Sequence, residues 1–249
     1  EAFLKLLSQK QISIKDLITK EVEFSESPEI YNSFSSEEKP LSILLRYDLK
    51  TEPKIQFEKN EIILENNKKI KVGVIGAGNF ASSTIIPILK ELKRSCQILG
   101  VASSGGLSSE ALAKNFKIKN KYQTEDEIFE SDEIDAVFVL TQHFNHAELV
   151  IRGINSGKAV YVEKPLAINV DSITKIEEAM YNAEDPKIFL GFNRRFSKAS
   201  MFIKEKLNAS PANALNFRFS VPKLERDHWT NIKEIGGGRV VGEAIHAID

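Results

Sequence analysis

Residues 70–90 read IKVGVIGAGNFASSTIIPILK, and this stretch decides the fold. An apolar run ends at a Gly-Ala-Gly sequence, and a helix-like pattern starts at once. A dinucleotide-binding turn requires this order of strand, glycines and helix. Gly76 permits the tight turn, Gly78 lets the backbone approach a pyrophosphate, and Ala81 keeps the helix close to the strand. The N–H groups at the helix start would then face the phosphates.

The residues that follow alternate between strand and helix patterns. Strands are predicted over 97–103, 135–141, 158–162 and 188–192, and helices from the glycines to about Leu92 and over 108–116, 145–155 and 170–183. The first helix is expected to bury Ile85, Ile86, Leu89 and Leu92 on one face. The strand over 135–141 is nearly all apolar, which indicates burial on both faces of a parallel sheet. We therefore predict an α/β fold, a Rossmann doubly wound parallel sheet.

Composition limits the class of protein. The 249 residues are 42% hydrophobic and 28% charged, with a formal net charge of -1, so we expect a cytoplasmic globular protein without nucleic-acid or membrane partners. No apolar run has the length of a membrane span. The single cysteine, Cys96, excludes an internal disulfide and a cysteine-based zinc site, and we expect it to be a buried structural thiol and the chain to hold no metal.

Residues 1–50 show a different periodicity. We predict the end of a helix over 2–7, a short buried segment over 12–18, a helix over 25–34 capped by Ser25 or Ser27, and a strand over 41–47. Residues 51–69 are charged and polar around 62–64, so we interpret them as a linker with a short hairpin. A domain boundary is expected there.

Chemistry-bearing residues follow the predicted strands. The second strand ends at Ser103 and Ser104 without an acidic residue, so a 2'-phosphate is not repelled and the choice between NAD and NADP stays open. The next strand ends near His143 and His146, which could line a nicotinamide pocket or simply cap and pack the following helix. Ligands bind at this edge of an open α/β sheet.

The sequence Glu163-Lys164-Pro165 follows the strand over 158–162. A lysine at that edge can donate to a substrate hydroxyl and to the cofactor ribose, and its charge can stabilise an alkoxide. A solvated Glu-Lys turn is the alternative.

Several motifs together resemble a known family. These are Gly76-Ala77-Gly78 with Asn79-Phe80, residues 141–146, Glu163-Lys164-Pro165-Leu166-Ala167, residues 191–196, and Gly236-Gly237-Gly238 running to His246. Their order and spacing over 70–249 resemble the glucose-fructose oxidoreductase and inositol dehydrogenase (Gfo/Idh/MocA) family. Residues 1–50 resemble the tail of a medium-chain alcohol dehydrogenase, so the chain looks like a fragment of a bi-domain oxidoreductase.

The resemblance implies a division of the chain beyond the linker. Residues 70–196 would form the Rossmann domain, and 197–249 would begin an α+β substrate domain whose mostly antiparallel sheet starts at a strand over 215–221 and is truncated.

The resemblance also implies hydride transfer between NAD or NADP and a carbon of a sugar, sugar nucleotide or cyclitol. Lys164 matches the family's lysine and His246 its acid/base histidine. The family commonly has an aspartate four residues before that histidine, where this chain has Gly242. If the neighbouring Glu243 faces the site, it could hold His246 as part of the catalytic group; otherwise the site lacks its carboxylate.

The remaining site residues fall into two groups. The cofactor group comprises Gly76, Gly78, Asn79, Phe80, Ser103, Ser104, Thr141, Gln142, Asn145, His146, Glu163 and Lys164. Substrate contacts are expected from His228 and Trp229, with packing as an equal alternative for Trp229. One of Arg194 and Arg195 could reach an anionic group of the substrate, while the other would be a surface or inter-subunit ion-pair partner.

The chain could form a homo-oligomer, and two alternatives to the enzymatic function stay open. The chain could be a degenerate module that holds a dinucleotide as a structural or sensing ligand. Residues 1–50 could instead serve as an arm that docks a partner chain.

Overall fold

The computed structural model describes residues 2–27, 29–30, 40–47, 69–208, 216–218, 220 and 223–249. The chain divides into two compact units, residues 1–62 and 63–249, which are described separately.

The first unit contains a small parallel sheet. Its elements are α1 (Ala2–Ser8), η1 (Lys15–Leu17), β1 (Lys20–Glu23), η2 (Phe24–Glu26) and β2 (Ile43–Arg46). Strand β1 pairs with β2, and the Arg46 guanidinium crosses the pair to the Glu21 carboxylate at 2.6 Å. Both partners are more than half exposed, so this ion pair contributes little stability.

The N-terminal predictions are only partly correct. The predicted strand over 41–47 is present as β2, but β1 was not predicted. The segment over 12–18 is not buried, since Leu17 is 53% exposed and the other apolar side chains are half-buried. Residues 24–26 form the 3₁₀ turn η2, which is capped by Glu23, whose N–H is 3.3 Å from the Glu26 carboxylate, and not by a serine. Residues 27, 29 and 30 are helical, in agreement with the predicted helix over 25–34, while residues 28 and 31–34 and the hairpin around 62–64 lie outside the described residues.

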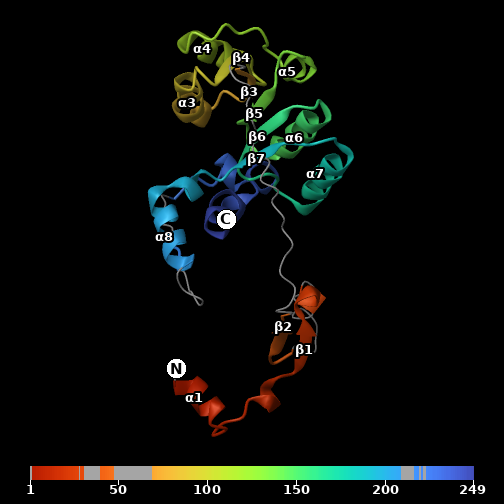
Figure 1. The fold of residues 1–249 in the computed structure, drawn as a ribbon, viewed down its shortest axis with the longest axis vertical. Coiled ribbons are helices and arrows are strands. Elements are labelled where there is room, and N and C mark those ends of the chain that lie inside the picture. Colours follow the sequence, from red (N-terminus) through yellow and green to blue (C-terminus); the bar gives the residue numbers. More distant parts are fainter. Residues whose placement is uncertain are drawn as a thin grey trace. The chain divides into compact units, whose positions relative to one another are not determined.

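The second unit is built on a five-stranded parallel sheet (Figure 1). In spatial order its strands are β4 (Cys96–Ala102), β3 (Ile70–Ile75), β5 (Ala136–Val139), β6 (Ala159–Glu163) and β7 (Ile188–Gly191). Every neighbouring pair is parallel. The predicted α/β class and all five predicted strands are confirmed.

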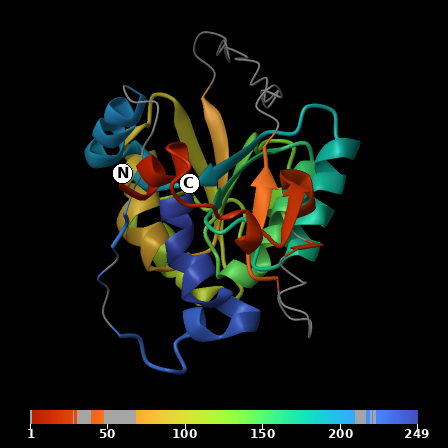
Figure 2. The same cartoon turned by 90° about the horizontal axis from the view of Figure 1, so that it is seen from below.

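Helices cover both faces of this sheet (Figure 1, Figure 2). The turn after β3 opens a helix that is π-wound over η3 (Ala81–Ile85) and continues as α3 (Ile86–Glu91). The other helices of the strand-rich part are α4 (Leu107–Asn115), α5 (Glu125–Glu130), η4 (His143–Asn145), α6 (His146–Asn155) and α7 (Val170–Asn182). Buried side chains of α3 and α4 pack on one face, and those of α5, α6 and α7 pack on the other. This is the doubly wound arrangement.

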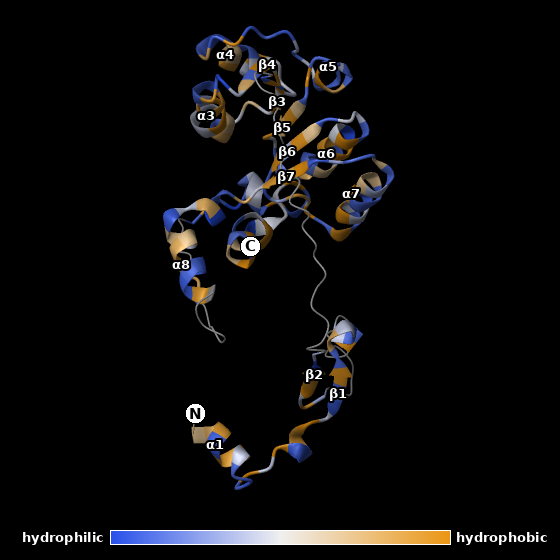
Figure 3. Ribbon diagram, viewed as in Figure 1, coloured by the Kyte–Doolittle hydropathy of each residue, from blue (hydrophilic) through white to orange (hydrophobic). Residues whose placement is uncertain are grey.

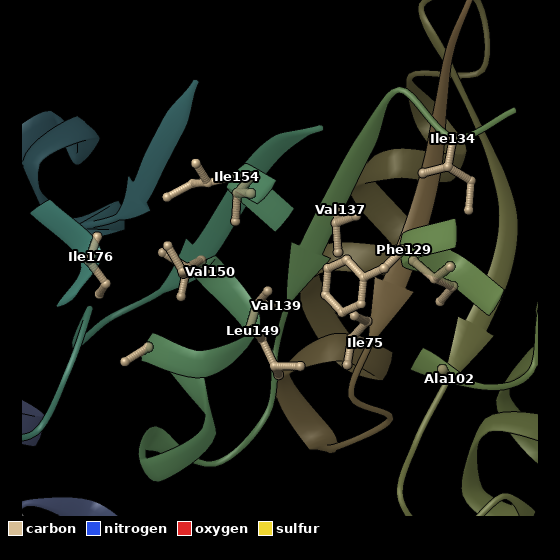
Figure 4. Packing of buried hydrophobic residues seen from close by; sticks show 14 of the residues in the cluster. Ile75, Ala102, Phe129, Ile134, Val137, Val139, Leu149, Val150, Ile154 and Ile176 are labelled. Atoms are coloured by element: carbon tan, nitrogen blue, oxygen red, sulfur yellow. The ribbon is translucent and has the colours of Figure 1, made fainter. Parts of the chain in front are cut away.

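The core between the sheet and α6 shows why the strands are so apolar (Figure 4). Val137 and Val139 are fully buried and pack with Leu149 and Val150 of α6. Phe138, between the two valines, faces the opposite cluster, where it stacks on Tyr161 of β6 at 4.8 Å. Strand β5 therefore packs side chains on both faces, as expected for a central parallel strand.

The chain after β7 is mainly helical where it is described. Its elements are η5 (Asn193–Phe196), α8 (Lys198–Asn208), η6 (Trp229–Asn231), α9 (Lys233–Gly236), a π-wound segment η7 (Val240–Ala244) and α10 (Ile245–Ile248). Polar and apolar residues alternate along α8 (Figure 3). The strand predicted over 215–221 lies partly outside the described residues, and those of its residues that are described are not in a strand.

Three local predictions differ from the structure. Helix α5 was not predicted, although Thr124 and Glu127 form a capping box at its start. Leu92 is 50% exposed because it follows the last turn of α3 instead of continuing its buried face. Cys96 is half-buried rather than buried. No helix in the described part of the chain is long and apolar enough to span a membrane.

Candidate active site

The carboxyl ends of the strands form the edge on which the predicted site residues lie. At the end of β3, Gly76 has a φ of +106°, and a Cβ on this residue would lie 2.4 Å from the carbonyl oxygen of Leu140. Its N–H donates to the Ala102 carbonyl at 2.8 Å. Only glycine fits this position. The hydrogen bond to Ala102 and the close approach to Leu140 hold the end of β3 beside the ends of β4 and β5.

The next residues provide an open approach for a phosphate group. No atom lies within 4 Å of the position that a Cβ on Gly78 would take. Asn79 and Phe80 are exposed at the start of the helix, whereas Ala81 is buried against the sheet. Gly78 is accessible and Ala81 is packed against the sheet, and this combination suits a pyrophosphate bound at the start of the helix.

The adenosine side of this turn carries hydroxyl groups. The Ser103 Oγ atom is buried and has no hydrogen-bond partner among the described residues, while Ser104 is exposed. An unpaired buried hydroxyl beside the turn is consistent with a polar ligand here. No feature of these two serines selects NAD over NADP.

At the end of β5, the predicted cofactor residues differ in accessibility. Gln142 is exposed, and Thr141 and Asn145 are half-buried, so these three can face a ligand. His146 is fully buried. Its Nδ1 atom lies 2.7 Å from the Pro165 carbonyl and its Nε2 atom 3.1 Å from the Thr141 carbonyl. We therefore assign His146 a place beneath the site, joining the segments after β5 and β6, instead of the predicted cofactor contact.

His143 is also buried and joins the end of β5 to the C-terminal helices. Its Nδ1 atom lies 2.8 Å from the Gly236 carbonyl, and its ring meets Trp229 edge-on at a centroid distance of 4.7 Å. Burial lowers the pKa of His143 to about 4. The imidazole is therefore neutral near pH 7 and acts as a packing group.

The glutamate of the Glu163-Lys164-Pro165 segment is turned into the sheet. Its Oε1 atom accepts a 2.7 Å hydrogen bond from the Tyr161 hydroxyl, and Oε2 accepts from the Lys164 N–H at 3.3 Å. Burial raises the pKa of Glu163, and burial together with Glu163 raises that of Tyr161. Sequence reasoning missed Tyr161, although a tyrosine two residues before a glutamate on one strand lies on the same face.

Lys164 is half-buried at the end of β6 and points toward the C-terminal helices. Its Nζ atom donates to the carbonyl of Gly242, in η7, at 2.7 Å. Burial is the largest influence and lowers the pKa of Lys164, while Glu163 and Glu243 oppose this shift and Arg194 adds to it. The structure thus joins two positions that are 78 residues apart in the sequence.

His246 lies near this lysine but lacks the expected carboxylate. Burial, Lys164 and Arg194 lower the pKa of His246, so the ring is neutral near pH 7. Its Nδ1 atom is buried without a hydrogen-bond partner in the part of the chain that the structure describes. The Glu243 carboxylate accepts from Arg239 at 2.9 Å instead. The expectation that Glu243 holds His246 is therefore not met.

The predicted substrate residues have intramolecular contacts. Arg195 donates through Nε to the Asp249 carboxylate at 3.0 Å and through Nη2 to the same group, so this arginine forms an ion pair within the chain. The N–H of Thr230 donates to His228 Nδ1 at 3.3 Å. Trp229 packs on His143, which agrees with the packing alternative.

The groups described above differ in what they offer a ligand. Lys164 offers a cation, His246 a neutral imidazole, and the turn at Gly76 and Gly78 an approach for phosphates. Among the described residues, no group of three or more His, Cys, Asp or Glu side chains could hold a metal ion.

Comparison with known proteins agrees with this arrangement. Residues 70–189 match the family model GFO_IDH_MocA, described as an oxidoreductase family with an NAD-binding Rossmann fold. The chain is 28% identical over 140 residues to inositol 2-dehydrogenase/D-chiro-inositol 3-dehydrogenase from Lacticaseibacillus casei, an alignment that covers 56% of this chain and 40% of the relative. The chain therefore spans well under half the length of that relative.

Two solved structures share the fold. One is myo-inositol dehydrogenase from Lactobacillus casei in complex with NAD(H) and myo-inositol, at 27% identity and a TM-score of 0.54, covering 57% of this chain and 42% of that chain. The other is KijD10, a 3-ketoreductase from Actinomadura kijaniata in complex with NADP and TDP-benzene, at 21% identity and a TM-score of 0.62, covering 73% and 56%. The second likeness concerns the fold alone.

The glycine turn after β3, the parallel sheet and the lysine at the end of β6 all lie within the matched residues. Residues 70–189 therefore form a Rossmann domain that is similar to the NAD-binding domain of the Gfo/Idh/MocA oxidoreductase family.

Proposed function

We propose that the chain is the cofactor-binding part of an NAD(P)-dependent oxidoreductase that acts on a CH–OH group of a sugar, sugar nucleotide or cyclitol. The inositol dehydrogenase relatives support this class of substrate. When bound, the nicotinamide cofactor supplies or accepts the hydride.

The residues of this chain would bind the cofactor and the substrate, and they would move the proton. Gly76 and Gly78 would admit the pyrophosphate, and Ser103 would face the adenosine ribose. The Lys164 ammonium would donate a hydrogen bond to the substrate oxygen and stabilise negative charge there. His246, neutral at pH 7, would take the hydroxyl proton during oxidation and return it during reduction.

One observation carries the proposal. Lys164 projects from the same sheet edge as the glycine turn, and its Nζ atom is held at 2.7 Å by the carbonyl of Gly242, four residues before His246. The cation and the imidazole come from separate elements, and Lys164 lies close enough to His246 to lower its pKa. A solvated Glu-Lys turn would not explain a half-buried ammonium with a buried acceptor.

The direct test uses a panel of candidate substrates that contains myo-inositol, other cyclitols and hexoses. Reduction of NAD and of NADP by each substrate is measured as absorbance at 340 nm. Lys164→Ala should lower kcat by about 10²–10⁴-fold while cofactor binding is retained, because the lysine acts mainly on the substrate oxygen. Lys175→Ala, which removes an exposed lysine from α7, is the matched control and should behave like the wild type. Full turnover by the Lys164→Ala variant would refute the proposal.

A second candidate is a catalytically degenerate module that holds a dinucleotide as a structural or sensing ligand. The Gly242 position, which offers no carboxylate, and the unpartnered Nδ1 atom of His246 favour it. This module would bind NADH in a fluorescence titration but would show no turnover with any polyol. Steady NAD or NADP reduction by one member of the panel would reject it.

A further inference from the structure

The Lys164 ammonium is oriented by a backbone carbonyl and not by a side chain. The acceptor is the Gly242 oxygen at 2.7 Å. Gly242 is buried within the π-wound segment η7, where it directs its carbonyl toward β6. Glu163, the nearest carboxylate in sequence, is hydrogen-bonded to Tyr161.

The space beside Gly242 is already filled by His143. A Cβ on Gly242 would lie 3.3 Å from His143 Cε1 and 3.4 Å from Thr230 Cγ2. The first distance is tighter than an ordinary van der Waals contact, and a longer side chain would extend into the same space. Position 242 can therefore carry a side chain only if the imidazole moves.

The imidazole is held firmly in this place. His143 is 6% exposed, its Nδ1 atom lies 2.8 Å from the Gly236 carbonyl, and Trp229 packs edge-on against its ring. Displacing the ring would break a buried hydrogen bond and open the contact with Trp229. The packing of His143 and Trp229 therefore leaves room for a glycine at position 242 and not for a larger residue.

We propose that His143 closes position 242 to a carboxylate side chain, so that in this protein a backbone carbonyl and not a carboxylate accepts from the Lys164 ammonium. The inference deepens the proposed function and rests on it for the role of Lys164 in turnover. The orientation of the lysine itself is a property of the chain and can be measured without turnover.

The groups that face the Lys164 ammonium determine what a new charge would do. Glu163 and Glu243 favour its protonation, and Arg194 opposes it. His143, His146 and His246 each lie close enough to Lys164 to sense its charge. A carboxylate in the place of the His143 ring would therefore act on Lys164 at similar range.

The test is competitive labelling of lysine amines with acetic anhydride across pH, read by peptide mass spectrometry. In the His143→Ala/Gly242→Asp double variant, the ring is gone and the carboxylate fits, so the pKa of Lys164 should rise by about one unit or more relative to His143→Ala. Gly242→Asp alone should unfold at lower urea concentration than the wild type. Val240→Asp adds the same charge at a 72% exposed position of η7 and should leave Lys164 unchanged.

Three results would overturn the proposal. The first is Gly242→Asp with wild-type stability, since His143 would then exclude nothing. The second is a double variant with an unchanged Lys164 pKa, and the third is a double variant that does not fold although His143→Ala does. Absence of turnover in the wild type would refute the proposed function and leave the labelling result intact.

Discussion

The turn at the end of β3 yields the sharpest prediction, through the substitution Gly76→Ala. An alanine at a φ of +106° is strained by about 1–2 kcal/mol. Its Cβ would also lie 2.4 Å from the Leu140 carbonyl oxygen, a backbone atom that cannot swing away, so overpacking adds about 1–3 kcal/mol. We expect the free energy of unfolding to fall by about 2–5 kcal/mol.

The neighbouring glycine offers a matched control. A Cβ on Gly78 would meet no atom within 4 Å, and its φ is not positive, so Gly78→Ala should leave stability within about 0.5 kcal/mol of the wild type. The same methyl group would occupy the approach of the pyrophosphate and should weaken NADH binding. The two substitutions thus separate folding from binding.

The assay is urea unfolding followed by circular dichroism, together with NADH titration of the folded variants. With an m-value of about 2 kcal/mol/M, the midpoint for Gly76→Ala should drop by roughly 1–2.5 M. A Gly76→Ala midpoint equal to that of the wild type would refute the steric reasoning. Unimpaired NADH binding by Gly78→Ala would refute the assignment of the phosphate site.

Three further predictions concern packing, pH and hydrogen bonding. Ile128→Ala should cost about 2–5 kcal/mol in urea unfolding because Ile128 is fully buried, whereas Ile88→Ala, at a 47% exposed position of α3, should cost much less; equal costs would contradict the described core. Since the pKa of His143 is about 4 when folded and near 6.5 when unfolded, the unfolded state binds more protons between these values. Stability should therefore fall as pH drops from about 6.5 to about 4, and His143→Gln should reduce this slope in acid titrations of the unfolding midpoint. Tyr161→Phe removes the donor to Glu163 Oε1 and should destabilise the protein by about 1–3 kcal/mol, and a neutral effect would show that this hydrogen bond is unimportant.

The elements that were predictable from sequence have local signals. The run over 135–141 predicts β5 because its apolar residues leave no polar face. The turn at Gly76 is predictable because a single residue type meets its geometry. Helix α5 was also predictable in principle, because Thr124 and Glu127 form a capping box at its start, but this signal consists of only two residues.

The features that were missed depend on partners distant in sequence. Strand β1 is short and charged, and it exists through its pairing with β2. His143 reaches the Gly236 carbonyl across 93 residues, and no local pattern marks that contact.

The two carbonyl contacts of His146 have one more consequence. A neutral imidazole carries a single N–H, and burial keeps this ring neutral. Only one of the two carbonyls, that of Pro165 at 2.7 Å or that of Thr141 at 3.1 Å, can therefore accept this hydrogen at a time. With the proton on Nδ1, the ring fastens the segment that carries Lys164. With the proton on Nε2, it fastens the segment after β5 instead, so the tautomer of one buried ring decides which border of the site is held.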